Sequence, residues 1–268
     1  MIFSMSSCSI AGSWVYERLD NYLADYFKEF ANFSRVQDEE IEIISTEFIN
    51  WFSENELIKV KVILEQLKNI NLLNPEKEIS SIYKDAEGIF TRSNFYFKSP
   101  IISFTKKINE VQIGQIRSHF KELREKRENE RSENGYSLID NYISGFDRIG
   151  IKLRDDQIDE INLKLEDHIE VREEWSSLQE QWIEDFVQLL KYNQSLDYET
   201  KMSAYLDSLE ELGDQKFREK IDKNELLAQE IISFVFKSSN KKQIDSFNRS
   251  LEVYLKSLNR ILSKRQVN

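Results

Sequence analysis

The apolar residues of this chain recur at helical spacing along most of its length. Near the N-terminus they fall three or four positions apart, on one face of a helix: Leu19, Tyr22, Leu23, Tyr26, Phe27, Phe30 and Phe33. The same spacing continues through residues 41–70, 79–86, 139–149, 196–212, 217–236 and 244–262. This pattern predicts an all-α fold, an elongated multi-helix bundle with long amphipathic helices.

Short start motifs mark where several helices begin. Ser34 precedes Gln37 by three positions, the spacing of a capping box, in which the two side chains bind free backbone N–H groups at a helix start. Similar starts lie at residues 109–112, 153–157 and 240–243. The glutamines of these four motifs are 75, 45 and 86 residues apart and show no fixed period. We interpret the motifs as repeated use of one helix start, not as a solenoid.

The longest periodic segment runs from Asp155 to Leu190. As one unbroken helix it would extend roughly 54 Å, which predicts an elongated shape. No Pro-, Gly- or Ser-rich linker divides the chain, so we expect a single helical domain over residues 13–268, with a candidate lobe boundary near residue 134. Pro100 is expected to kink or restart its helix, and Gly150 and Gly213 to end helices.

Composition supports helices and narrows the classes of partner. The chain of 268 residues has only 7 glycines and 2 prolines, too few for the turns of a sheet-rich fold. Lys and Arg number 37 against 48 Asp and Glu, a formal charge of −11. Because an acidic surface repels phosphate backbones, we expect no nucleic-acid partner. No apolar run is long enough to predict a transmembrane helix.

The residues that usually carry catalysis or bind metals are sparse. A di-iron bundle needs a glutamate three positions before a histidine, but Ile116 precedes His119 and Leu165 precedes His168. Neither histidine has further ligands at zinc-site spacing, and no nucleophile-elbow motif is present. We therefore assign no catalytic residue, metal ligand or cofactor and expect a protein that is not an enzyme.

One irregularity in the long segment points to a candidate ligand groove. Its helical stripe passes through polar residues flanked by indoles: His168, Arg172, Trp175, Gln179 and Trp182. An anionic or sugar-like ligand could stack on the indole rings and meet the arginine. The alternative interpretation is that this part of the helix extends beyond the core and faces water.

Cys8 is the only cysteine of the chain. Its surroundings, Met5-Ser6-Ser7-Cys8-Ser9, resemble the end of a bacterial lipoprotein signal, in which the cysteine sulfur carries diacylglycerol. We expect lipid attachment at Cys8, with residues 1–12 as the remnant of the signal and a tether. A full signal also has a basic region and an apolar region, so the true start codon is expected upstream of Met1. The alternative is an exposed thiol without a role.

Several motifs, in their order, resemble an uncharacterised family of bacterial outer-membrane lipoproteins. After the lipidated cysteine its members have an aromatic-rich leucine-aspartate segment, a helix start and a tryptophan stretch, similar here to residues 16–22, 33–37 and 51–58. Further helix starts match residues 108–112, 153–157 and 239–243. The chain has Phe52, Ser53 and Ile58 where the family has histidine, arginine and proline, so no role of that histidine is transferred.

The resemblance implies a protein anchored by lipid in the outer membrane, with its body in the periplasm, and it implies no reaction. Our leading hypothesis is therefore a non-enzymatic protein of the cell envelope whose partners are the membrane, through a lipid anchor such as palmitate, and other envelope components. The first alternative is a cytoplasmic helical scaffold that starts at Met1. The second is a small-molecule binder or enzyme with a site in the bundle.

Overall fold

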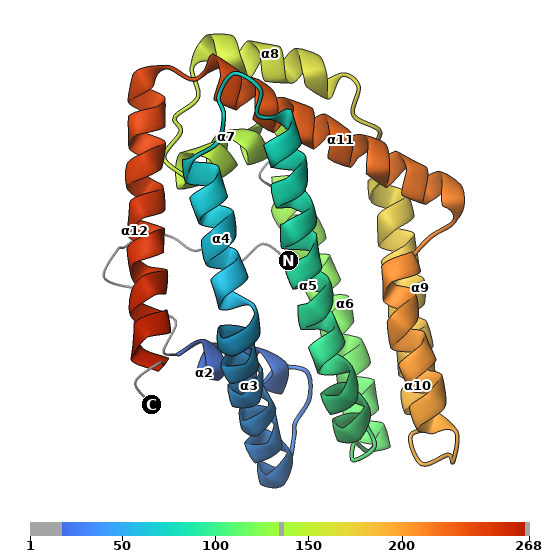
Figure 1. The fold of residues 1–268 in the computed structure, drawn as a ribbon. Helices are drawn as coiled ribbons and strands as arrows, with labels where there is room; N and C mark the ends of the chain where they lie inside the picture. The colour runs from blue at the N-terminus through green and yellow to red at the C-terminus, as the bar shows by residue number, and fades with distance from the viewer. Residues whose placement is uncertain (1–17, 134–136, 266–268) are drawn as a thin grey trace.

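The computed structural model describes residues 18–133 and 137–265, and this part of the chain is all-helical (Figure 1). It contains eleven α-helices and one short 3-10 helix, and none of the described residues forms a strand. The prediction of an all-α multi-helix bundle is therefore confirmed.

The helices before and after residue 134 form two sequence halves. The first half contains α2 (Leu19–Lys28), α3 (Arg35–Asn55), α4 (Leu57–Lys68), α5 (Glu76–Thr105) and α6 (Glu110–Glu133). The second contains α7 (Leu138–Arg148), α8 (Asp155–Leu165), α9 (Arg172–Leu190), α10 (Tyr198–Asp207), η1 (Ser208–Glu211), α11 (Gln215–Ser238) and α12 (Lys241–Arg265). In Figure 1, α12, α4, α5 and the α9–α10 pair run side by side, and α8 and α11 lie across one end.

The periodic segment over residues 155–190 does not form one unbroken helix, so the length of roughly 54 Å does not apply to it. α8 ends at Leu165 and α9 begins at Arg172. The break is held by Asn224 of α11, whose side chain accepts the Ile169 N–H at 2.9 Å and donates to the Ile169 carbonyl at 2.8 Å. A side chain from a distant helix thus binds backbone groups that a continuous helix would have paired internally.

Pro100 does not restart a helix, because α5 runs through it to Thr105. The residues after the proline, Ile102 and Phe104, pack against a buried cluster, and this packing offsets the hydrogen bond that the proline cannot donate. Gly150 and Gly213 do follow helix ends, both with φ of 86°, a conformation that glycine adopts without steric cost.

Two buried clusters form the core, and each takes residues from both halves. The first core combines Ile70 and Ile79 with ten residues of the second half: Phe146, Ile151, Leu153, Ile161, Leu227, Ile231, Val235, Phe236, Phe247 and Leu251. The second core combines Ile108, Ile113 and Ile116 with Val187, Leu190, Tyr198 and Met202. Residue 134 therefore separates two halves of the sequence but not two separately packed lobes.

The two halves repeat one arrangement. α4 of the first half packs against α12 of the second, and α9 of the second packs against α6 of the first. The sequence repeats as well: residues 20–22 and 140–142 both read Asp-Asn-Tyr, and residues 101–104 and 231–234 both read Ile-Ile-Ser-Phe. We infer that the halves are structurally equivalent and exchange helices across the molecule.

Glu56 lies where the expected helix over residues 41–70 is divided into α3 and α4. Its side chain is 1% exposed and accepts hydrogen bonds from Arg92 Nε and Nη2, at 2.8 Å each, and from Lys59 Nζ at 2.8 Å. The hydrogen bonds from Arg92 hold the pKa of Glu56 below its usual range. The ion pair therefore joins the α3–α4 junction to α5.

We expect Glu56→Gln to lower the free energy of unfolding by about 2 kcal/mol at pH 7, because charge-assisted hydrogen bonds to a buried group are lost. A carboxyl group whose pKa is lowered by folding stabilises the protein above its unfolded pKa and loses that contribution as pH falls through its folded pKa. The difference between wild type and variant should shrink accordingly below about pH 4.5. Urea unfolding at several pH values measures it, with the exposed Glu54→Gln as control; equal effects of both variants would contradict this account.

Candidate functional site

The cysteine expected to carry lipid, Cys8, lies outside the described residues, so the structure gives no account of its surroundings. None of the helices in the described ranges is long and apolar enough to cross a bilayer. Among those same residues, no group of three or more His, Cys, Asp or Glu side chains is arranged to hold a metal ion.

The stripe that grouped the candidate groove residues is not continuous. His168 lies in the segment between α8 and α9, and Arg172 is the first residue of α9, with its guanidinium 3.7 Å from Glu170. Because α8 and α9 are separate helices, helical spacing does not carry His168 onto the face of the two indoles.

Both indoles of the candidate groove stack on other aromatic rings of the same chain. Trp175 stacks on Phe217 with ring centroids 5.9 Å apart, and Trp182 stacks on Phe186 at 5.7 Å. Gln179 lies between them on α9 and is half-buried. The stacking gives both indoles a packing role within the chain, and the groove stays a prediction.

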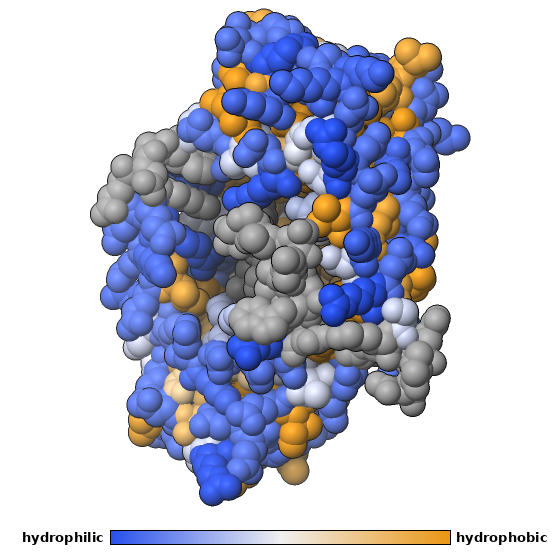
Figure 2. Space-filling view, turned by 90° about the vertical axis from the view of Figure 1, so that its left-hand side faces the viewer, coloured by the Kyte–Doolittle hydropathy of each residue, from blue (hydrophilic) through white to orange (hydrophobic). Residues whose placement is uncertain are grey.

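The surface also lacks a single dominant apolar area on the face seen in Figure 2. Its described part is mostly hydrophilic, with apolar side chains in small separate areas. Scattered exposed apolar residues are usual in folded proteins and do not by themselves mark a binding site.

The polar group that the structure does bring together lies at the starts of α3 and α6. Ser34 and Gln37 form a capping box, as predicted, and Asn109 and Gln112 form the equivalent pair at α6. The two buried glutamines also bind each other: Gln112 Nε2 donates to Gln37 Oε1 at 2.8 Å, and Gln37 Nε2 donates to Gln112 Oε1 at 3.2 Å. Two helix starts 75 residues apart are thus joined through their capping side chains.

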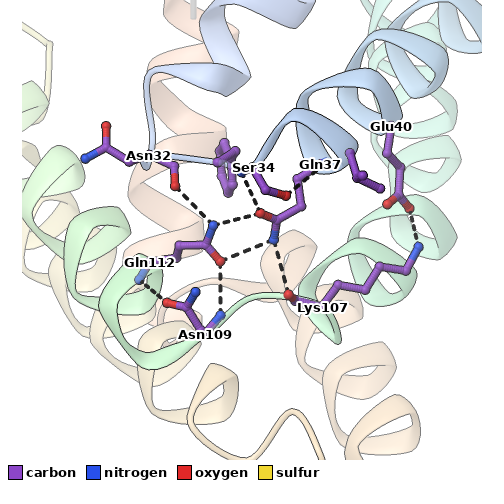
Figure 3. A pocket seen from close by; sticks show the side chains of 9 residues that line it. Asn32, Ser34, Gln37, Glu40, Lys107, Asn109 and Gln112 are labelled. Atoms are coloured by element: carbon purple, nitrogen blue, oxygen red, sulfur yellow. Dashed lines mark hydrogen bonds and ion pairs between the residues drawn. The ribbon is translucent and has the colours of Figure 1, made fainter.

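A surface pocket of about 520 Å³ opens in front of this glutamine pair (Figure 3). Its polar lining includes the carboxylate of Glu40, 22% exposed, and the backbone carbonyl of Lys107, which accepts from Gln37 Nε2 at 3.1 Å. The ammonium of Lys107 binds Glu40 at 2.7 Å. The remaining lining residues are Asn32, Phe33, Ser34, Val36, Asn109 and Gln112. A volume of this size can hold a small ligand or one side chain of a partner.

The second half contains the same pair of helix starts. Gln243 Nε2 donates to Gln157 Oε1 at 2.8 Å and to the Lys152 carbonyl at 2.8 Å. In the first half, Gln112 Nε2 likewise donates to Gln37 Oε1 and to the Asn32 carbonyl, the latter at 3.2 Å. Gln157 and Lys152 each lie 120 positions after their first-half equivalents, and Gln243 lies 131 after Gln112.

The second pair has an arginine where the first has a serine. Arg154 stands 120 positions after Ser34, and its Nη1 donates to Gln243 Oε1 at 2.6 Å and to the Ser238 carbonyl at 3.2 Å. Arg154 also binds Asp156 through two hydrogen bonds of 2.8 and 2.9 Å, which raise the pKa of Arg154 and lower that of Asp156. In the second half, this chain's own guanidinium therefore binds the oxygens that correspond to those beside the first-half pocket.

Sequence reasoning found the four helix starts but missed their pairing. The intervals between the glutamines did not reveal the repeat, because the paired glutamines lie 75 residues apart in the first half and 86 in the second. The repeated Asp-Asn-Tyr and Ile-Ile-Ser-Phe motifs carried the signal that could have revealed it.

Comparison with known proteins identifies no relative. No protein-family model, no curated protein and no solved structure matches this chain. The resemblance to outer-membrane lipoproteins therefore rests on the residues quoted for it.

Proposed function

We propose that this protein is a lipid-anchored, non-enzymatic protein of the bacterial cell envelope whose helical body binds another envelope component. The observation that carries the proposal is Cys8 within Met5-Ser6-Ser7-Cys8-Ser9, followed by the ordered motifs of the lipoprotein family. Two or three acyl chains would hold the protein stably in a membrane, at about 0.8 kcal/mol per buried methylene.

A lipid at Cys8 would hold the helical body close to the membrane. Eleven positions separate Cys8 from Leu19, where α2 begins, and a chain of that length reaches at most about 40 Å. A helical body on such a tether would stay close to the membrane surface to which the lipid binds. We place this body in the periplasm, at the outer membrane.

The test is mass spectrometry of the protein expressed in a Gram-negative cell from its gene with the upstream codons. We expect a mature N-terminus at Cys8 that carries diacylglycerol and an acyl chain, and recovery of the protein with the outer membrane. The variant Cys8→Ser should lose both properties. An unmodified Cys8 in a soluble fraction would refute the proposal and favour the cytoplasmic scaffold that starts at Met1.

A second candidate function, a binder of small molecules or peptide side chains, is favoured by the pocket in front of Gln37 and Gln112. Its lining consists of amide groups, one ion pair and backbone carbonyls, which can recognise a ligand through hydrogen bonds. This candidate does not depend on lipid attachment, so the two proposals can be tested separately.

A further inference from the structure

We propose that the pocket between the starts of α3 and α6 binds a guanidinium group, from a small molecule or from an arginine of a partner. The equivalence of the two halves supports this proposal. In the second half, the oxygens of Gln243 and Ser238 receive a guanidinium from Arg154. In the first half, the equivalent oxygens belong to Gln112 and Lys107 and border an open pocket.

The hydrogen bonds of the pocket show how a guanidinium would fit. Gln37 Nε2 now donates to both oxygens, Lys107 O at 3.1 Å and Gln112 Oε1 at 3.2 Å. In the second half, Arg154 Nη1 makes both of these contacts, and Gln157 Nε2 donates to Ser238 Oγ. A bound guanidinium would therefore replace the long contact from Gln37 to Gln112 and share the Lys107 carbonyl, which has a second lone pair.

Charge favours a cationic ligand over an anion. Backbone N–H groups at both helix starts are already bound by capping side chains: those of Ser34, Gln37, Asn109 and Gln112. The nearby ammonium of Lys107 is paired with Glu40. The Lys107 side chain is 53% exposed and can swing into water, which would release the Glu40 carboxylate for a guanidinium. The net charge of −11 also attracts cations to the molecule.

The size of the side chain at position 34 determines whether the site is open to a ligand. Ser34 leaves the first-half pocket open, whereas Arg154, at the equivalent position of the second half, binds Gln243 with its own guanidinium. Val36 occupies the position equivalent to Asp156, so the first half lacks the carboxylate that holds Arg154 in place. Glu40 is the acidic side chain of the pocket lining and would take the corresponding role for a ligand.

The test uses three probes on the full chain: N-acetylarginine methylamide, its neutral citrulline analogue and methylguanidine. Titration followed by amide NMR shifts should show saturable binding of the arginine probe at one site, with shifts around Gln37 and Gln112, and at least tenfold weaker binding of citrulline. Binding of methylguanidine with similar affinity would indicate a small-molecule ligand. Binding of the capped arginine alone would indicate a partner's arginine.

Variants at position 34 provide the decisive comparison. We expect Ser34→Arg to abolish binding, because its own guanidinium fills the pocket, and Ser34→Asn to retain it, because asparagine caps a helix without adding a cation. Glu40→Gln should weaken the arginine probe about tenfold. The variant Arg154→Ser should bind a second equivalent of arginine probe, with shifts around Gln157 and Gln243.

Circular dichroism and thermal unfolding will show that each variant is folded before binding is measured. The proposal is overturned if the folded wild-type protein binds neither cationic probe, if it binds arginine and citrulline equally, or if Ser34→Arg binds the arginine probe as well as wild type. Because the assay needs no lipid, these outcomes do not depend on the modification of Cys8.

Discussion

Replacing Gln157 by leucine is expected to lower the free energy of unfolding by about 3 kcal/mol. The Gln157 side chain is fully buried and makes three hydrogen bonds: it accepts from the Arg154 N–H and from Gln243 Nε2, and it donates to Ser238 Oγ. Leucine has a similar volume but removes all three hydrogen bonds: the Arg154 N–H loses this acceptor, and Gln243 Nε2 and Ser238 Oγ lose one bond each. Urea unfolding measures the effect.

A double-mutant cycle tests whether this loss reflects the glutamine pair. The variant with both Gln157→Leu and Gln243→Leu should be more stable than the sum of the single effects predicts, by about 1 kcal/mol or more. Each single substitution breaks the hydrogen bond between the two amides, and the double variant loses that bond only once. The exposed Gln188→Leu serves as control and should change stability by less than about 0.5 kcal/mol. Additive effects of the two core substitutions would show that the amides do not act as a pair.

Met202→Ala should cost about 3 kcal/mol, because it removes a fully buried side chain and leaves a cavity. Met202 belongs to the second half of the chain but packs in the second core beside Ile108, Ile113 and Ile116 of the first half. Leu196→Ala, at a fully exposed position nearby, should be close to neutral. Thermal or urea unfolding of both variants checks the prediction, and similar effects of the two would contradict the packing described here.

Local features of this fold could be predicted from the sequence, because they depend on neighbours within one helical turn. The capping box of Ser34 and Gln37 forms between residues three positions apart, and Gly150 ends α7 through its own backbone conformation. The apolar stripes also located most helices, since burial on one face imposes their spacing.

Features that depend on distant segments could not be predicted in this way. The break after α8 is held by Asn224, 55 positions after Ile169, and nothing within the segment marks it. The pocket likewise forms only when the starts of α3 and α6 meet, which no local pattern indicates. Its contrast with the filled site at Arg154 becomes visible only when the two halves are compared in space.

We infer that two equivalent halves share their cores and fold as one unit. Native-state hydrogen exchange of Met202→Ala tests it most directly. We predict that a substitution in the second core lowers the opening free energy of the Ile161 and Ile231 amides, in the first core, by the same amount as its global effect on stability. Unchanged protection of Ile161 and Ile231, with protection lost only around the second core, would contradict the claim.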